Sequence, residues 1–219
     1  MKACIFDLDG TLANTLPTLI YIGNRALSAC GFRTVSPDVY PQLIGNGANR
    51  LISGLIQCAT GVPPFPGELS RVRAEYDRIY AENPLYLTVA YDGITSLLDA
   101  LTAHGIALAV LSNKPHDMTC RVISGLFGDG IFSVCFGQRD GVPRKPAPDG
   151  ALAIAHSLGV SPADILYIGD SGVDMCTGNA AGMVTAGVLW GFRPESELRL
   201  HDAAHIVTAP CELLPLAVF

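Results

Sequence analysis

The sequence predicts an α/β fold: a Rossmann-like, doubly wound parallel sheet with a small helical insert after its first strand. Three observations lead to this expectation. From residue 86 onward, short apolar runs alternate with helical patterns, as in a parallel sheet covered on both faces. Another apolar run, residues 3–6, stands by itself near the N-terminus. Between them, residues 16–85 show helical patterns and no convincing strand.

The insert is expected to hold three helices. Apolar residues recur at helical spacing in three segments, residues 19–30, 51–59 and 69–80. The first two segments are followed by Gly31 and Gly61, and glycine commonly ends a helix.

The second half of the chain reads as a series of alternating strands and helices. Strands are expected at residues 106–111, 132–136, 165–168, 184–188 and 205–207, and helices at residues 94–104, 118–127, 149–158 and 174–181. We therefore expect one α/β core domain made of residues 1–15 and 86–219. A helical domain of residues 16–85 would interrupt it.

Composition limits the class of protein and its partners. At 219 residues, with 49% hydrophobic and 16% charged residues, the chain is that of a compact globular protein. Its formal net charge of −6 gives no electrostatic footprint for nucleic acid or for an anionic membrane. Its apolar runs are far shorter than the ~20 residues of a spanning helix. The expected partners include neither nucleic acid nor a membrane, and the expected state is a monomer or a homodimer.

The cysteines indicate the compartment. The seven cysteines form no C-x-x-C pair, as expected for reduced, mostly buried thiols in a cytoplasmic protein. No Cys or His pair has the spacing of zinc ligands. The N-terminus reaches Asp7 too soon to hold the apolar region of a signal peptide.

Two carboxylates follow the first strand. Asp7 and Asp9 lie two residues apart in the stretch Asp7-Leu8-Asp9-Gly10-Thr11, so in an extended chain both point to the same side. At the carboxyl end of a parallel strand they would face the place where such sheets bind ligands. The pair suits a nucleophile with a proton donor, or a divalent cation. A solvated turn is the other interpretation.

Polar residues also follow two later elements. Ser112 and Asn113 come directly after the strand at residues 106–111, and their hydroxyl and amide groups can donate to phosphate oxygens. Lys145 precedes a helix and could supply a point charge for phosphate. The alternatives are an ordinary polar turn before Pro115 and a solvated loop lysine.

The strand at residues 165–168 runs into Gly169-Asp170-Ser171. Mg²⁺ is typically bound by one or two carboxylates, so Asp170 together with Asp7 would suffice. Ser171 and Asp174 could then orient the water ligands of the metal. Alternatively, Asp170 or Ser171 caps the following helix, with Asp174 in its first turn.

Together these stretches resemble the four motifs of the haloacid dehalogenase superfamily, in its phosphatase branch. Asp7-Leu8-Asp9-Gly10-Thr11 matches the first motif, and the later family positions are matched by Ser112, Lys145 and the Asp170/Asp174 pair. Asp9 separates the chain from the dehalogenases proper, which lack that second acid. The resemblance spans nearly the whole chain.

The resemblance implies a Mg²⁺-dependent phosphatase that acts in two steps. Asp7 would attack the phosphate monoester while Asp9 protonates the leaving alkoxide. Asp9 would then activate the water that hydrolyses the aspartyl-phosphate. Mg²⁺ would be held by the Asp7 carboxylate, the Asp9 backbone carbonyl and Asp170. The transferring phosphoryl group would be bound by Ser112, Asn113 and Lys145.

In this superfamily a helical insert after the first motif is a mobile cap that excludes water and chooses the substrate. We therefore expect residues 16–85 to be a cap domain. Its residues 43–52 resemble the cap segment of phosphoglycolate phosphatases, which assigns substrate selection to Gly45, Asn46, Gly47 and Arg50. Glycines ahead of a helix expose backbone N–H groups that suit a small carboxylate. A loop that binds no ligand is the other interpretation.

The expected substrate is a small phosphorylated metabolite, with 2-phosphoglycolate as the first candidate. Two departures from the phosphoglycolate phosphatase pattern weaken that choice: Asn14 replaces a common Asp, and Asp92 replaces a usual proline. A sugar phosphate, a nucleotide or pyrophosphate are the alternatives, followed by a sugar phosphomutase. A phospho-acceptor signalling domain also places Asp and Lys at strand ends, but Asp9 and the cap count against it.

Overall fold

The computed structural model describes residues 1–218 and confirms the predicted α/β class. One six-stranded sheet has the order β5-β4-β1-β6-β7-β8, and all neighbouring strands are parallel. The strands are β1 (Ala3–Phe6), β4 (Ala107–Pro115), β5 (Val134–Gln138), β6 (Ile165–Gly169), β7 (Val184–Val188) and β8 (His205–Val207).

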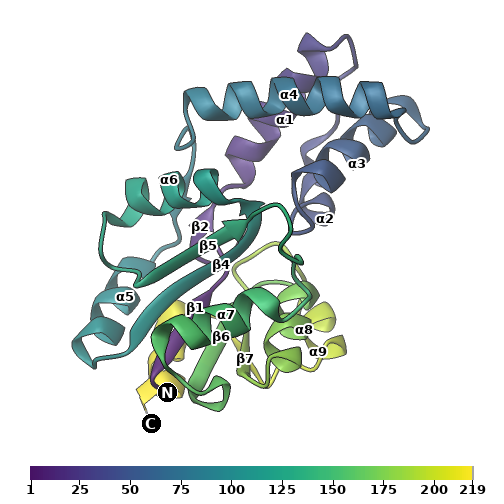
Figure 1. Ribbon diagram of the computed structural model, residues 1–219. Coiled ribbons are helices and arrows are strands. Elements are labelled where there is room, and N and C mark those ends of the chain that lie inside the picture. The colour runs from purple at the N-terminus through teal and green to yellow at the C-terminus, as the bar shows by residue number, and fades with distance from the viewer. Residues whose placement is uncertain (219) are drawn as a thin grey trace.

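Helices cover both faces of the sheet (Figure 1). One face packs against α5 (Ile94–Ala103), α6 (His116–Phe127) and α10 (Leu213–Val218). The other face packs against α7 (Asp149–Leu158), while α8 (Gly172–Ala180) contacts β6 and β7 and is followed by α9 (Glu195–Leu200). This double cover is the doubly wound arrangement that the alternating pattern predicts.

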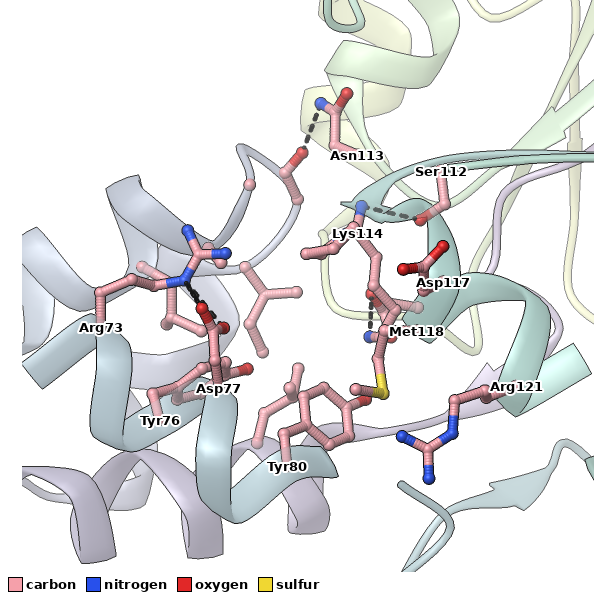
Figure 2. Close-up of a pocket in the computed structure, with 18 of the residues that line it drawn as sticks. Arg73, Tyr76, Asp77, Tyr80, Ser112, Asn113, Lys114, Asp117, Met118 and Arg121 are labelled. Atoms are coloured by element: carbon pink, nitrogen blue, oxygen red, sulfur yellow. Dashed lines mark hydrogen bonds and ion pairs between the residues drawn. The ribbon is translucent and has the colours of Figure 1, made fainter. Parts of the chain in front are cut away.

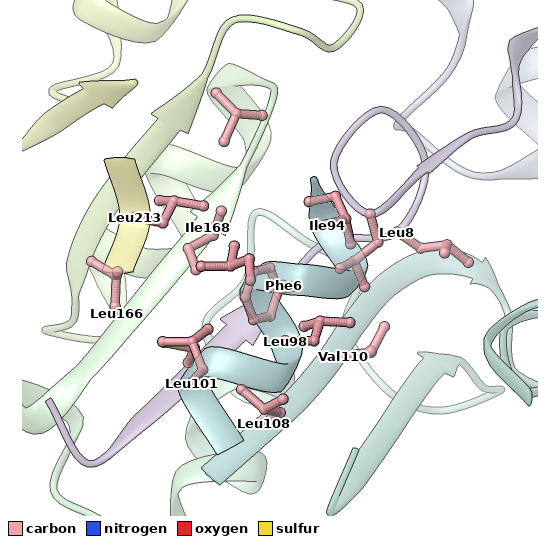
Figure 3. Close-up of a cluster of buried hydrophobic side chains, with 14 of the residues drawn as sticks. Phe6, Leu8, Ile94, Leu98, Leu101, Leu108, Val110, Leu166, Ile168 and Leu213 are labelled. Atoms are coloured by element: carbon pink, nitrogen blue, oxygen red, sulfur yellow. The ribbon is translucent and has the colours of Figure 1, made fainter. Parts of the chain in front are cut away.

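The first strand shows why the sequence forms this sheet. All four residues of β1 are fully buried, because successive side chains point to opposite faces and both faces are covered. Phe6 points into the cluster beneath α5, where it meets Leu98 and Val110 (Figure 3). Ile5 belongs to the cluster on the α7 side.

The insert forms a helical unit with its own hydrophobic core. It consists of α1 (Leu16–Ala29), α2 (Tyr40–Leu43), α3 (Ala48–Thr60) and α4 (Pro66–Glu82). Figure 1 shows these helices gathered at one end of the sheet, away from the two chain termini. The sequence predicts α1, α3 and α4 but not the one-turn α2. The domain boundaries at 15/16 and 85/86 stay a prediction.

A short antiparallel ribbon joins the two parts of the molecule. The chain leaves the sheet through β2 (Ala13–Asn14) and returns through β3 (Val89–Ala90), with Asn14 paired to Val89. The sequence does not predict this ribbon, because two residues are too short a run for a period-2 pattern.

Four core elements differ from expectation by two residues or more in at least one limit. Strand β5 covers residues 134–138 instead of 132–136, and α6 begins at residue 116 instead of 118. The other two are β4 and α8. Strand β4 is expected to end at residue 111 but continues to Pro115 through a break in register, so Ser112, Asn113 and Lys114 lie buried within it. Helix α8 begins at Gly172, two residues earlier than expected, because Ser171 and Asp174 form a reciprocal capping box. In both places the buried polar side chains have hydrogen-bond partners, and a pattern of apolar residues cannot predict such partners.

Across residues 1–218, no helix is both long enough and apolar enough to cross a membrane.

Candidate active site

The site lies where the carboxyl ends of three neighbouring strands meet. Phe6 at the end of β1 pairs with Val110 of β4 on one side and with Ile168 of β6 on the other. The chain runs from β1 outward to β4 and β5 before it crosses to β6, so β1 lies at the switch point of the topology. Ligands in open α/β sheets bind outside such a point.

Asp7 and Asp9 occupy a tight turn directly after β1. The Asp7 N–H donates to the carbonyl of Ile168 at 2.9 Å, which anchors the buried nucleophile candidate to β6. Gly10 has φ +87°, and a Cβ at this position would collide with the Asp170 carboxylate. Only glycine combines this left-handed conformation with so close an approach.

Lys145 lies between two of the predicted site carboxylates. Its Nζ is 2.7 Å from Asp174 Oδ1 and 2.9 Å from Asp7 Oδ1. Burial alone would lower the pKa of Lys145, but the Asp174 and Asp7 charges raise that pKa well above its usual value. The side chain is therefore a fixed buried cation beside Asp7.

A capping box holds Asp174 in place. Asp174 Oδ2 accepts the Ser171 hydroxyl at 2.6 Å and the Ser171 N–H at 3.2 Å. The residue thus serves as an N-terminal partner of α8 and also lies within the acidic cluster. The two interpretations of this segment, helix cap and metal site, are compatible.

Three buried carboxylates form a candidate metal site. Oxygen atoms of Asp7, Asp170 and Asp174 lie within 4.8 Å of one another. Asp7 Oδ1 is buried and lacks a well-aligned hydrogen bond, although Lys145 is near. An orphaned carboxylate oxygen in an all-oxygen cluster fits a hard divalent cation.

The electrostatics of the cluster agree with that fit. Burial raises the pKa of Asp7 to about 7; Lys145 opposes the rise, and Asp174 and Asp9 add to it. Burial and the neighbouring Asp174 and Asp7 charges also raise the pKa of Asp170 well above its usual value, against the Phe192 N–H that donates to it at 2.7 Å. Carboxylates held this close repel one another, and a cation relieves the repulsion.

The predicted phosphate-binding residues have different surroundings. Ser112 lies buried on the cavity wall, where its Oγ accepts the Lys114 N–H at 3.2 Å. Its own O–H has no acceptor among residues 1–218 and is available to donate. The Asn113 side chain instead donates to the Gly45 and Lys145 carbonyls, at 2.9 and 3.1 Å, and accepts the Lys145 N–H at 3.0 Å. Both amide protons therefore have acceptors, and the side chain holds the backbone of Lys145 in place. The phosphate contact of Asn113 stays a prediction.

Lys114 is the site residue that the sequence does not predict. Its Nζ contacts both carboxylate oxygens of Asp9, at 2.6 and 2.7 Å, across 105 residues of chain. The apolar run ends at residue 111, so the sequence places Lys114 in a polar turn. Its position three residues past that run, after Ser112, is the only signal that could have indicated it.

A cavity of about 330 Å³ lies between the cap helices and this edge of the sheet. Its walls include Asp7, Asp9, Ser112 and Lys114 from the core and Leu51, Arg73, Tyr76 and Tyr80 from the cap. Figure 2 shows Ser112 and Lys114 facing Arg73, Tyr76 and Tyr80. Of the predicted cap residues, Gly45 and Gly47 line the cavity. Asn46 and Arg50 do not, and Arg50 is exposed on α3. A role of Arg50 in substrate selection stays a prediction.

Core side chains hold the cap against the sheet. The Arg193 guanidinium donates to the carbonyls of Pro41, Gln42 and Ile44 at the end of α2. Arg121 of α6 donates to the Ala81 carbonyl of α4 at 3.0 Å. With the Asn113–Gly45 bond, these contacts fix the loop that lines the cavity.

Comparisons with known proteins agree with this geometry. The family model described as haloacid dehalogenase-like hydrolase matches residues 4–188. The chain is 31% identical over 203 residues to a phosphoglycolate phosphatase of Thiobacillus denitrificans, covering 91% of this chain and 89% of the relative. It is also 31% identical to a phosphoglycolate phosphatase of Haemophilus influenzae, over 197 residues, with 89% and 88% covered.

Solved structures extend the similarity to the whole architecture. A crystal structure described as a predicted phosphoglycolate phosphatase from Haemophilus somnus superposes with a TM-score of 0.91 at 27% identity. The match covers 99% of this chain and 97% of that one, cap helices and sheet alike.

Proposed function

The chain belongs to the haloacid dehalogenase-like hydrolases and is a phosphatase of that family, and from this premise we propose that it hydrolyses 2-phosphoglycolate with the help of Mg²⁺. One observation carries the proposal: Asp7, Asp9, Lys145 and Asp170 meet at one sheet edge, beside a cavity roofed by the cap.

In the proposed reaction Asp7 attacks phosphorus and carries the phosphoryl group transiently. Its place at the end of β1 is fixed by the Ile168 carbonyl, so the nucleophile needs little rearrangement to reach a bound ester. Lys145, 2.9 Å away, neutralises charge that develops on the phosphoryl oxygens, and the free Ser112 hydroxyl donates to them.

Asp9 has the role of general acid and then of general base. It lines the cavity two residues after Asp7, where it can protonate the leaving alkoxide. After the alcohol departs, the same carboxylate takes a proton from the water that attacks the phosphoryl group. The aspartyl-phosphate is then hydrolysed and Asp7 is restored.

Asp7, Asp170 and the backbone carbonyl of Asp9 are the proposed holders of Mg²⁺. When bound, the metal supplies positive charge that stabilises the phosphoryl oxygens and offsets the crowding of the acidic cluster. Asp174 and Ser171 orient this site from the first turn of α8.

The substrate proposal rests on the relatives and on the cap. The relatives from Thiobacillus denitrificans and Haemophilus influenzae are phosphoglycolate phosphatases, and they align with the cap as well as with the core. A sugar phosphate, a nucleotide or pyrophosphate is the competing substrate class, because the core chemistry is the same for each.

Phosphate release from a substrate panel tests the proposal. The panel contains 2-phosphoglycolate, sugar phosphates, nucleotides and pyrophosphate, each with Mg²⁺ and with EDTA, and Asp7→Asn serves as the inactive control. We expect Mg²⁺-dependent release with a preference for 2-phosphoglycolate of ~10-fold or more, about 1.4 kcal/mol of discrimination. Equal turnover of the whole panel would remove the named substrate. No turnover by folded protein that binds Mg²⁺ would remove the phosphatase function.

A further inference from the structure

Lys114 is a buried cation that the proposed mechanism leaves without a role. It lies near the end of β4 with only 4% of its side chain exposed. Its Nζ contacts both oxygens of the Asp9 carboxylate at 2.6 and 2.7 Å. The candidate general acid therefore has a fixed positive charge at its side, on the cavity wall.

The rest of the surroundings of Lys114 belong to the cavity and are largely apolar. The ring centroid of Tyr80, on cap helix α4, is 5.3 Å from Nζ. Met118 and Leu51 line the same cavity, and Figure 2 shows Tyr80 and Met118 close to Lys114. A charge in such a setting is poorly hydrated and interacts strongly with an ion that enters.

Two donors at this wall have no acceptor. An ammonium carries three N–H groups, and the two contacts with Asp9 leave at least one of them without a partner within residues 1–218. The Tyr80 hydroxyl is buried and likewise has no hydrogen-bond partner in that part of the chain. Buried donors without acceptors are costly in the free protein, so a ligand acceptor would be favoured here.

The reach of Lys114 defines which part of a substrate it would contact. A general acid lies about 2.6–3.2 Å from the oxygen that it protonates. Since Lys114 touches the same carboxylate, its Nζ lies within roughly 6 Å of the leaving oxygen. A group one carbon away from that oxygen, such as the carboxylate of an esterified 2-hydroxy acid, would lie between the leaving oxygen and Lys114 Nζ.

We infer that Lys114 recognises a carboxylate on the leaving group, with Tyr80 as a second donor, and thereby selects phosphate esters whose leaving group carries a carboxylate over those whose leaving group is an uncharged alkyl chain. The inference rests on the proposed function, since it concerns the leaving group of the same reaction. It assigns carboxylate recognition to the core, whereas the sequence assigns it to the cap loop at Gly45–Gly47.

Two arginines, Arg73 and Arg121, also line the cavity, and both hydrogen-bond to protein groups. Arg73 of α4 binds Asp77 through both carboxylate oxygens, at 2.8 and 2.9 Å, across the cavity from Lys114 (Figure 2). Arg121 donates to the Ala81 carbonyl. Arg73 therefore offers a matched control: another cation on the same cavity that is paired with a carboxylate, but one that lies away from the candidate general acid Asp9.

The test compares two esters that differ only in the carboxylate: 2-phosphoglycolate and ethyl phosphate. In Lys114→Met, kcat/KM for 2-phosphoglycolate relative to ethyl phosphate should fall by ~10-fold or more, the usual weight of a hydrogen bond to a charged group. Lys114→Arg, which keeps the charge, should restore part of the ratio. Arg73→Met should leave the ratio within ~3-fold of the wild-type value.

Four other results would overturn the inference, and they can be distinguished from one another by the activities of the wild type and of Lys114→Met. An equal loss of both activities in Lys114→Met would mean that Lys114 acts only through Asp9. If Lys114→Met kept the wild-type kcat/KM for both esters, the inference would also be wrong, while the proposed function would stand. Wild-type protein that hydrolyses both esters equally well would remove the inference and the named substrate together, and a wild type inactive on every phosphomonoester would remove the proposed function as well.

A second measurement needs no variant, should Lys114→Met fail to fold. 3-Phosphonopropionate is a non-hydrolysable mimic of 2-phosphoglycolate, in which a CH₂ group replaces the bridging oxygen. In a crystal structure of the wild-type protein with 3-phosphonopropionate, the carboxylate should lie within hydrogen-bonding distance of Lys114 Nζ. A carboxylate bound instead to Arg73 or to the amides of Gly45–Gly47 would overturn the inference.

Discussion

Lys145 donates to Asp174 Oδ1 at 2.7 Å, although the two residues are 29 positions apart and both are almost fully buried. Asp7 lies on the other side of the same ammonium. One lysine thus keeps two buried carboxylates together at the centre of the site. Removing it leaves them uncompensated.

We predict that Lys145→Met lowers the free energy of unfolding by roughly 3–5 kcal/mol in EDTA, the usual cost of removing one partner from a buried ion pair. Lys2→Met is the matched control, because Lys2 makes an equally short pair with Asp164 at 2.7 Å but with 70% of its side chain exposed. Its effect should stay within about 1 kcal/mol. Urea unfolding of both variants measures the difference, and equal small effects would contradict the assigned burial.

Mg²⁺ should stabilise the folded protein through the Asp7–Asp170–Asp174 cluster. At about 100 times its dissociation constant, a ligand that binds only the folded state adds about 2.7 kcal/mol. Thermal unfolding with Mg²⁺ or EDTA measures this shift. Asp170→Asn should lose most of it and the surface variant Asp164→Asn should keep it. A wild type that gains nothing from Mg²⁺ would argue against a metal site in this cluster.

Asp9→Asn should slow hydrolysis of alkyl phosphates by ~10²–10⁴-fold, the typical contribution of a positioned general acid. p-Nitrophenyl phosphate has a leaving group that barely needs a proton. Asp9→Asn should therefore release about one nitrophenolate per enzyme in a burst and then stall, because the second step lacks its base.

Asp117→Asn is the control for that experiment, since Asp117 is another carboxylate on the cavity wall without a role in the chemistry. It should keep both steps near wild-type rates. If phosphorylation slowed equally for alkyl and nitrophenyl esters in Asp9→Asn, the acid role of Asp9 would be wrong.

Arg193→Met should loosen the docking of the cap. Arg193 donates to three carbonyls at the end of α2, next to the loop that lines the cavity. Loss of these charge-assisted bonds should speed hydrogen exchange of amides in residues 41–47 by ~10-fold or more. KM for the phosphoester should rise as well. Arg199→Met, which loses only a surface pair with Glu195, should leave the exchange of this loop unchanged.

The core of the fold follows from the sequence because its signals are local. The strands that carry the site residues begin as short apolar runs in the sequence. The strand expected at residues 184–188 has the limits found for β7. The order of the motifs then places Asp7, Ser112 and Asp170 at one edge, since parallel strands share a carboxyl end. Residues at neighbouring strand ends are brought together by topology alone.

The parts that the sequence does not predict depend on contacts across the chain. The pairing of Lys114 with Asp9 needs β4 to continue past its apolar run, which happens because buried polar side chains find partners there. Asn113 reads as a phosphate ligand, but its amide is used by Lys145 and Gly45. The contact of Arg193 with the end of α2 depends on how the cap packs against the core, which the sequence does not show. None of these contacts produces a periodic pattern in the sequence, so none can be predicted from it.

Covalent labelling of Asp7 tests the central claim most directly. The protein is mixed with 2-phosphoglycolate and Mg²⁺, quenched in acid during turnover and analysed by mass spectrometry of its peptides. We expect the mass of one added phosphoryl group on the peptide that contains Asp7, and no label or turnover in Asp7→Asn. Steady phosphate release with Asp7 unmodified, or wild-type turnover by Asp7→Asn, would contradict it.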